Sequence, residues 1–200
     1  MVGNWKWGEY VLSEENRERK RQQMLKQCFE LFVKQGLENT SLNDLTSYCK
    51  TYKAAFYVYF KSKDEIVVEA AKMYMQTLDD IFKNEFSNPK GSVEDALKRG
   101  FEVICERRNE LRFIYQVVSS PKYGKKSREE ISEIYSKYFK YSEKFAEIYG
   151  IEHEKIRPYF LLFVGTIHDY CLWENDELVQ EKLDFIYSRV TKIEKKEGKI

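Results

Sequence analysis

Apolar residues recur along most of this chain at spacings of three and four, which is the period of an amphipathic α-helix. The pattern forms a stripe from Leu25 to Phe32 and stops at Gly36, a residue suited to the left-handed conformation that closes a helix. It returns after Ser62 and continues to about Phe86, before an Asn-Pro pair and a glycine break the chain. The amino-terminal half therefore predicts two substantial helices with a shorter, different segment between them.

The pattern continues beyond that break. It predicts a helix opening at Ser92, a shorter one over about 111–118 and a long one over about 128–149, with the KYGKKS segment as a basic surface loop before the last of these. The alternation of apolar and polar residues that marks a strand is missing after Phe86. The predicted fold class is therefore all-α.

The last two helices carry the most regular pattern, with apolar residues at alternating spacings of four and three. Each such seam packs against another helix. The first of the two helices has a second apolar side at Leu161, Val164, Cys171 and Leu172, so it must be buried on most sides. One side can face its own domain and the other a second subunit. The alternative is that both seams pack inside one monomer. The seam residues are Ile156, Phe160, Phe163, Ile167 and Tyr170, followed by Val179, Leu183, Ile186, Val190 and Ile193.

The segment TSLNDLTSYCKTYKAAFYVYFKSKDE, from Thr40 to Glu65, has a different character. Ser41 with an aspartate three residues later is similar to a capping box, and it opens a short helix. A tight turn near Lys50 separates it from a second short helix over about 52–59, which is crowded with aromatic residues. Two short helices joined this closely predict a helix-turn-helix, whose second helix enters the DNA major groove.

Two stretches of this region resemble a known family. FYVYFKSKDEI resembles the hallmark of the tetracycline-repressor (TetR) family of bacterial transcription regulators, and MLKQCFELFVKQGLENTSLNDL resembles the family's first helix and the turn after it. The resemblance covers roughly residues 17–70. It implies an amino-terminal DNA-binding domain over 1–63 and a helical effector-binding and dimerisation domain over 64–200. It also implies a cytoplasmic homodimer that binds a palindromic operator on double-stranded DNA, usually as a repressor, with no enzymatic activity.

The resemblance assigns roles to individual residues. It implies phosphate contacts for Thr40, Ser41, Tyr57 and Lys63. It implies contacts to base edges or nearby backbone for Tyr52, Lys53 and Ala55. The turn departs from the family pattern, because Lys50 and Thr51 stand where the family usually has glycine and an aliphatic residue. A lysine is poorly suited to positive φ, so we expect a strained or reshaped turn with added charge near the DNA, and Thr51 as the hydroxyl cap of the second helix.

Charge is distributed unevenly along the chain. Residues 1–63 carry 11 Lys and Arg against 7 Asp and Glu, whereas the remainder carries 23 against 26. A basic amino-terminal domain on an acidic body suits a DNA-binding protein. The four cysteines form no CxxC pair, which suits a reducing cytosol. The longest apolar run is far too short to span a bilayer, so no membrane partner is expected.

The body is rich in aromatic residues, and some of them could line a pocket for a small effector. Because it lacks phosphate-binding glycines and a basic cradle, we expect that effector to be mostly apolar or aromatic. The family implies a pocket among the fourth, fifth, seventh and eighth helices, and a dimer interface formed by the last two helices. Candidate pocket walls are Met73, Ile104, Phe113, Tyr138, Tyr141, Phe163 and His168. Residues expected at the dimer interface are Ile156, Phe160, Phe163, Ile167, Val179, Leu183, Ile186 and Val190.

Two alternatives come from other classes of protein. A DNA-binding adaptor would use its carboxy-terminal domain to recruit a protein, and an apolar cavity in that domain would count against it. A helical enzyme would use His168 and Cys171, which share a helix face with Glu174 one turn beyond. The sequence lacks a phosphate loop, a nucleophile elbow and an HExxH motif, so no cofactor and no metal is expected.

Overall fold

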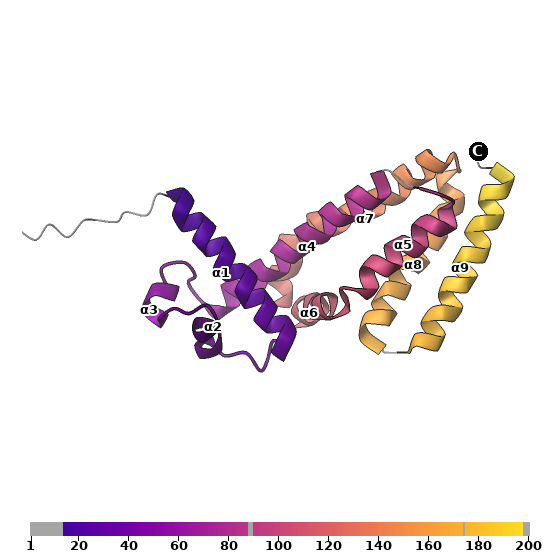
Figure 1. The fold of residues 1–200 in the computed structure, drawn as a ribbon. Coiled ribbons are helices and arrows are strands. Elements are labelled where there is room, and N and C mark those ends of the chain that lie inside the picture. Colours follow the sequence, from indigo (N-terminus) through magenta and orange to yellow (C-terminus); the bar gives the residue numbers. More distant parts are fainter. Residues whose placement is uncertain (1–13, 88–89, 174, 198–200) are drawn as a thin grey trace, which may run out of the picture. The chain divides into compact units, whose positions relative to one another are not determined.

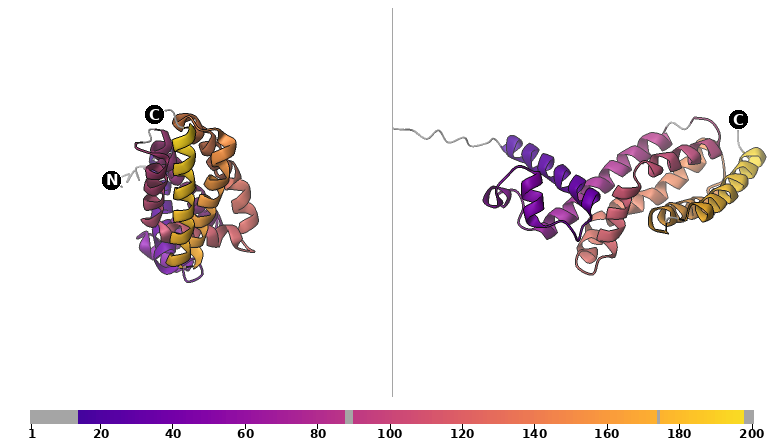
Figure 2. Two further views of the ribbon diagram at one scale, coloured as in Figure 1. Left: turned by 90° about the vertical axis from the view of Figure 1, so that its right-hand side faces the viewer. Right: turned by 60° about the horizontal axis from the view of Figure 1, so that its bottom comes forward.

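The computed structural model describes residues 14–87, 90–173 and 175–197, and all regular structure within them is α-helical (Figures 1 and 2). This confirms the predicted all-α class. The helices of the described residues are α1 (Glu14–Gln35), α2 (Leu42–Tyr48), α3 (Lys53–Phe56), α4 (Lys63–Ser87), α5 (Val93–Cys105), α6 (Arg108–Ser119), α7 (Gly124–Tyr149), α8 (His153–Trp173) and α9 (Asp176–Glu197).

The chain divides into two compact units between Ile66 and Val67. The first unit holds α1, α2, α3 and the first turn of α4, and the second holds the rest of α4 and the other helices. The expected division at residues 63 and 64 falls in that same first turn of α4.

The core of the first unit is aromatic. Phe32, Phe56 and Phe60 are almost completely buried, and the rings of Phe56 and Phe60 lie 5.2 Å apart between centroids. Leu45 fixes α2 in the same core, where it has no exposed surface. The four-residue helix α3 is therefore held by its buried phenylalanine, since so short a helix is not stable on its own.

The turn between α2 and α3 is a regular Schellman motif built around a lysine. The Thr51 amide donates to the Thr46 carbonyl (2.9 Å) and the Lys50 amide donates to the Ser47 carbonyl (3.0 Å). Lys50 adopts φ 50° and is the only described non-glycine residue with positive φ. The turn thus keeps its shape without glycine, at a cost of roughly 1–2 kcal/mol in backbone strain. The expected hydroxyl cap at Thr51 is wrong, because Tyr52 is the N-cap of α3 and makes no side-chain cap hydrogen bond.

The second unit is a bundle in which α8 packs against α6, α7 and α9, and α9 also packs against α5 (Figures 1 and 2). Ser92 and Asp95 form a capping box at the start of α5. The buried Glu194 carboxylate of α9 accepts the Val93 amide at 3.0 Å. The two helices are therefore joined by a polar contact as well as by apolar packing.

Helix α7 begins four residues earlier than expected, because the predicted basic loop is already helical at Gly124. Tyr123 and Ser127 are buried, and the Ser127 hydroxyl donates to the Gly124 carbonyl at 3.1 Å. A Cβ at residue 124 would lie 2.6 Å from the Val118 carbonyl oxygen, so glycine allows this close approach. These buried contacts extend α7 toward its amino terminus. The lysines of the segment had made it look like a solvated loop in the sequence.

The two seams of α8 and α9 lie inside the chain. All eight residues expected at the dimer interface are buried in the single subunit, and Ile186 and Val190 have no exposed surface. Their placement at a subunit interface is therefore wrong, and the alternative of packing within one monomer describes them correctly. A 4-3 spacing shows that a face is packed, but it does not show against which helix. The corrected residues are Ile156, Phe160, Phe163, Ile167, Val179, Leu183, Ile186 and Val190.

Candidate DNA-reading surface and apolar cavity

Helix α3 presents an open surface of aromatic and basic side chains. Tyr52 is 86% exposed and Tyr57 is 51% exposed, although large apolar rings are usually covered. Lys50, Lys53 and Ala55 are exposed on the same short segment. Thr51, between the helices, is half-buried. This surface combines positive charge, hydroxyl donors and flat rings, which are the groups that bind phosphates and base edges.

The two hydroxyl residues before α2 differ sharply. Ser41 is exposed, its hydroxyl accepts the Asp44 amide at 3.2 Å, and the Asp44 carboxylate accepts the Ser41 amide at 2.7 Å. These hydrogen bonds lower the pKa of Asp44. Thr40 is fully buried, and its hydroxyl donates to the Gly36 carbonyl at 2.7 Å. Thr40 therefore needs correction as a phosphate-contacting side chain, because its hydroxyl closes the turn after α1.

Lys63 is half-buried at the start of α4. Its ammonium group donates to the Leu37 carbonyl at 3.2 Å. This contact holds a positive charge beside the loop that leads into α2. The N-terminus of a helix also favours anions, so both groups attract a phosphate.

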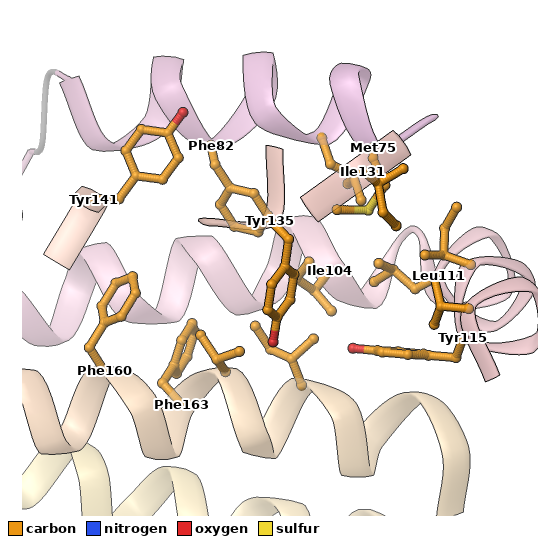
Figure 3. Close-up of a pocket in the computed structure, with 15 residues that line it drawn as sticks. Met75, Phe82, Ile104, Leu111, Tyr115, Ile131, Tyr135, Tyr141, Phe160 and Phe163 are labelled. Atoms are coloured by element: carbon orange, nitrogen blue, oxygen red, sulfur yellow. The ribbon is translucent and has the colours of Figure 1, made fainter. Parts of the chain in front are cut away.

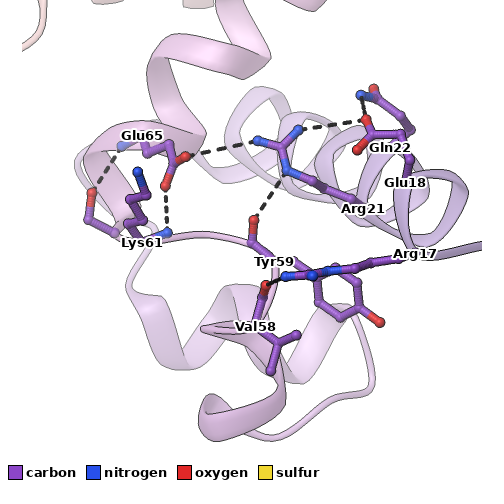
Figure 4. Close-up of polar contacts among 9 residues, drawn as sticks. Arg17, Glu18, Arg21, Gln22, Val58, Tyr59, Lys61 and Glu65 are labelled. Carbon is purple, nitrogen blue, oxygen red and sulfur yellow. Dashed lines mark hydrogen bonds and ion pairs between the residues drawn. The ribbon is translucent and has the colours of Figure 1, made fainter. Parts of the chain in front are cut away.

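Two arginines of α1 hold the segment that follows α3 (Figure 4). The Arg17 guanidinium donates to the Val58 carbonyl at 2.9 Å, and the Arg21 Nε donates to the Tyr59 carbonyl at 3.2 Å. Arg21 also lies 4.0 Å from the Glu65 carboxylate, and its guanidinium lies 5.0 Å from the centre of the Phe60 ring. The basic cluster at the start of α1 thus fixes the end of α3, a role that its sequence pattern did not indicate.

An apolar cavity of about 130 Å³ lies inside the second unit (Figure 3). None of its lining residues carries a charge, so it suits an apolar molecule. Besides α4, α5, α7 and α8, helix α6 contributes four lining residues, which the sequence did not indicate. The lining residues are Met75, Leu78, Phe82, Ile104, Leu111, Ile114, Tyr115, Val118, Ile131, Tyr135, Tyr141, Phe160, Phe163, Val164 and Ile167.

The residues proposed from sequence as pocket walls separate into three groups. Ile104, Tyr141 and Phe163 line the cavity. Three others do not: Met73 is half-buried elsewhere on α4, Phe113 is buried elsewhere, and His168 is exposed with its ring against Tyr115 at 4.8 Å. The side chain of Tyr138 lies outside the described residues. A shift of two positions along α4 brings Met75 to the cavity, where the sequence pattern had suggested Met73.

Three tyrosine hydroxyls are the polar atoms of the cavity lining. The Tyr141 hydroxyl donates to the buried Asp79 carboxylate at 2.6 Å, so it points to α4 and away from the cavity (Figure 3). The Tyr115 hydroxyl points from α6 toward the middle of the cavity, and the Tyr135 hydroxyl reaches toward α8 (Figure 3), although Tyr135 is 49% exposed. Burial raises the pKa of Tyr115, so this phenol stays protonated and able to donate. The cavity thus has a largely apolar lining with two phenol hydroxyls.

His168 and Cys171 do not form an acid–base or metal site. His168 is exposed, whereas Cys171 is buried and burial raises the pKa of its thiol to about 11. Among the described residues, no group of three or more His, Cys, Asp or Glu side chains could hold a metal ion. Glu174 lies outside the described residues.

A surface on α8 and α9 remains apolar and uncovered in the single chain. Trp173 is 72% exposed and Phe185 is 46% exposed. Gly165 on α8 is exposed, and a Cβ there would meet nothing within 4 Å. We call the exposed set the outer face. The outer face consists of Leu161, Leu172, Trp173, Leu178 and Phe185.

No helix in the described part of the chain has both the length and the apolar character needed to cross a bilayer.

Comparisons with known proteins agree with this architecture. Residues 25–70 match the family described as bacterial regulatory proteins, tetR family. Two proteins of Bacillus subtilis, the HTH-type transcriptional regulators YerO and YuxN, are 34% identical over 56 residues and 27% identical over 93 residues. These matches cover 28% and 45% of this chain, but only 19% and 32% of the length of those relatives.

Solved structures share the fold over most of the chain. A TetR-family regulator from Mesorhizobium loti superposes with a TM-score of 0.67 at 13% identity, covering 92% of this chain and 98% of its own. Escherichia coli NemR gives 0.65 at 14% identity, covering 86% and 97%. Bacillus subtilis FadR in complex with stearoyl-CoA gives 0.59 at 15% identity, covering 84% and 98%. Residues 25–70 therefore match the TetR family of bacterial regulatory proteins in sequence, and the described chain shares the fold of solved TetR-family structures.

Proposed function

We propose that this protein is a cytoplasmic, homodimeric transcriptional repressor whose binding to a palindromic operator is modulated by a small, mostly apolar effector. The observation that carries the proposal is the coexistence of two features in one chain. One is the exposed aromatic and basic surface of α3, and the other is the uncharged cavity of the second unit.

The DNA contacts divide into positioning and reading. Lys63, Ser41 and Tyr57 offer an ammonium group and hydroxyls to phosphates, which fix the register of the protein on the duplex. Tyr52 and Lys53 lie at the start of α3 with their side chains exposed, and they are our candidates for reading base edges. Lys50 adds charge beside them, and Ala55 leaves room for close approach of the DNA.

The effector acts through the cavity. Met75, Leu78 and Phe82 line the cavity and belong to α4, whose first turn carries Lys63. A molecule that binds one conformation of the second unit more tightly than another shifts the population between them, and it lowers DNA affinity if the operator prefers the other conformation. The two phenols, Tyr115 and Tyr135, suit a single polar group such as a hydroxyl or carbonyl on an otherwise apolar molecule.

The homodimer uses the outer face of α8 and α9. Large apolar side chains left exposed on two packed helices, among them a tryptophan and a phenylalanine, are typical of a protein interface. A two-fold dimer also matches a palindromic operator, because each half-site then meets the same helix.

The second candidate function is a DNA-binding adaptor that recruits a protein, but the uncharged cavity favours a small effector. FadR is seen with stearoyl-CoA, a ligand that joins an apolar acyl chain to a phosphorylated CoA group.

A thermal-shift screen with cavity variants tests the effector. Lipophilic compounds should raise the melting temperature with concentration, because a ligand that binds only the folded state stabilises it. Val164→Phe places a ring in the cavity and should abolish this response without loss of DNA binding, whereas Val164→Ala should retain both. If phosphorylated metabolites stabilise the protein and lipophilic compounds do not, the proposed effector class is wrong.

A further inference from the structure

Two cysteines that are distant in sequence lie close together inside the first unit, which carries the candidate DNA-reading surface and is called the DNA-reading unit below. The Sγ atoms of Cys28 on α1 and Cys49 at the end of α2 lie 3.8 Å apart, and both residues are free thiols. The Cys49 Sγ also lies 3.8 Å from the Met24 carbonyl oxygen. The Cys49 side chain therefore packs against the turn of α1 that runs from Met24 to Cys28.

The two thiols are not equivalent. Cys28 has no exposed surface, whereas Cys49 is partly exposed and can be reached by a small oxidant. The hydrogen bond from Cys28 lowers the pKa of Cys49, while that same contact and burial raise the pKa of Cys28. Because the thiolate is the nucleophile, Cys49 is the sulfur that reacts first with an oxidant, and Cys28 is placed to react second.

We propose that Cys28 and Cys49 form an oxidisable dithiol, a modification site at which a peroxide closes an intramolecular disulfide inside the DNA-reading unit. The Cys49 thiolate attacks one peroxide oxygen, the O–O bond breaks, and protonation releases water and leaves a sulfenic acid. The Cys28 sulfur then attacks the Cys49 sulfur, and the hydroxyl leaves as a second water with the Cys28 proton. The two thiols lose two electrons, and hydrogen peroxide takes up both to become two waters.

Closing this bond alters the helix-turn-helix. A disulfide has an S–S length of about 2.05 Å, so the sulfurs must approach by roughly 1.8 Å. Cys49 is the C-cap of α2 and precedes Lys50, whose positive φ already strains the turn. A displacement of Cys49 therefore passes directly to the turn that positions α3. This consequence rests on the proposed DNA-binding function, and it predicts weaker operator binding by the oxidised protein.

The remaining thiols supply internal controls. Cys105 is exposed and Cys171 is buried, and both belong to the second unit. Burial is the main cause that raises the pKa of each thiol, so both are less nucleophilic than Cys49. A selective response at residues 28 and 49 thus cannot be attributed to general thiol oxidation.

Peptide mapping of the full chain tests the modification. The protein is treated with hydrogen peroxide, free thiols are blocked with N-ethylmaleimide, and a tryptic digest is analysed by mass spectrometry. Trypsin cleaves after Lys26, Lys34 and Lys50, so the two cysteines fall in separate peptides, 27–34 and 35–50. We expect these peptides to be joined by a disulfide that dithiothreitol removes. The proposal is overturned if Cys28 and Cys49 remain fully alkylated while Cys105 becomes oxidised.

DNA binding by the same samples tests the consequence. Fluorescence polarisation with labelled duplex DNA should show affinity weakened about tenfold or more on oxidation, the loss of roughly one good base contact, with recovery in dithiothreitol. Cys28→Ala and Cys49→Ser should each bind like the reduced wild type and show no response to peroxide. An unchanged affinity in protein with a mapped disulfide would overturn the coupling to α3. If the reduced protein binds no DNA, the proposed function fails, while the peptide map still decides the modification.

Discussion

Neighbouring residues on α9 provide a sharp test of which face is core and which is interface. Ile186 has no exposed surface and packs within the subunit, whereas Phe185 is 46% exposed on the outer face. Truncation of a buried isoleucine to alanine removes apolar contacts and leaves a cavity, which typically costs about 2–5 kcal/mol. Because 1 kcal/mol shifts the melting temperature of a protein of this size by about 2–4 °C, Ile186→Ala should lower it by about 4–20 °C.

Phe185→Asp should behave in the opposite way. Its ring is not part of the monomer core, so a charge there leaves the fold intact, but it places an uncompensated charge within the proposed interface. We expect the variant to sediment as a monomer at micromolar concentration, with unchanged helical circular dichroism at 25 °C. Ile186→Ala should remain a dimer at that temperature.

Two measurements decide this pair, sedimentation velocity for the assembly and thermal melting for stability. The reasoning is refuted if Phe185→Asp remains a dimer while Ile186→Ala becomes a folded monomer. That outcome would show that the seam containing Ile186 forms the dimer interface. A monomeric wild type would remove the homodimer altogether.

Three further predictions concern single side chains. Lys50→Gly should stabilise the protein against urea by up to about 1 kcal/mol by relieving positive φ, yet weaken DNA binding and reduce its salt dependence, as polarisation titrations at several salt concentrations would detect. Arg21→Ala removes the hydrogen bond to Tyr59 and should lower the unfolding free energy by about 1–3 kcal/mol in urea titrations; an unaltered midpoint would contradict its role as a clamp. Burial raises the pKa of Tyr187 to about 12, so the folded state keeps this proton longer than the unfolded state, and stability should fall from about pH 10 to pH 12. Tyr187→Phe should reduce that fall in urea titrations across this range, and an identical fall in both proteins would argue against it.

Local signals in the sequence predicted the helix ends well. Ser41 and Asp44 form the capping box that their spacing predicted, Ser92 begins a helix as expected, and Gly36 and Gly150 close their helices with positive φ. Capping depends on residues within a few positions of each other, so the sequence holds all the necessary information. Lys50 shows the limit of this rule, because the turn with its two backbone hydrogen bonds places an exposed lysine at positive φ, a conformation that lysine disfavours.

Contacts between distant elements were harder to infer. The spacing of Ile186 and Val190 revealed a packed face but not its partner, and the true partner lies within the same chain. Likewise, the hydrogen-bond acceptors of Arg17 and Arg21 are backbone carbonyls about forty positions later in the chain. A carbonyl is the same in every residue, so the sequence carries no mark of such an acceptor.

The cavity could be predicted in part from the sequence. Its apolar character follows from composition, and Ile104, Tyr141 and Phe163 were placed on faces that line it. A helix turns by about 100° per residue, so a small error in register moves a side chain to another face, as the difference between Met73 and Met75 illustrates. On α6 the sequence suggested Phe113, whereas four other residues of that helix line the cavity, because the lining depends on how α6 packs against α7 and α8.

We propose that this chain reads DNA as a symmetric dimer through α3. In vitro selection from a random library of duplex DNA tests it most directly, because the selection itself identifies the preferred operator sequence. We predict enrichment of an inverted repeat by the wild type, with altered preference for Lys53→Ala and uniformly weaker binding for Lys63→Ala. Failure to enrich any sequence under reducing conditions at low salt would contradict the account.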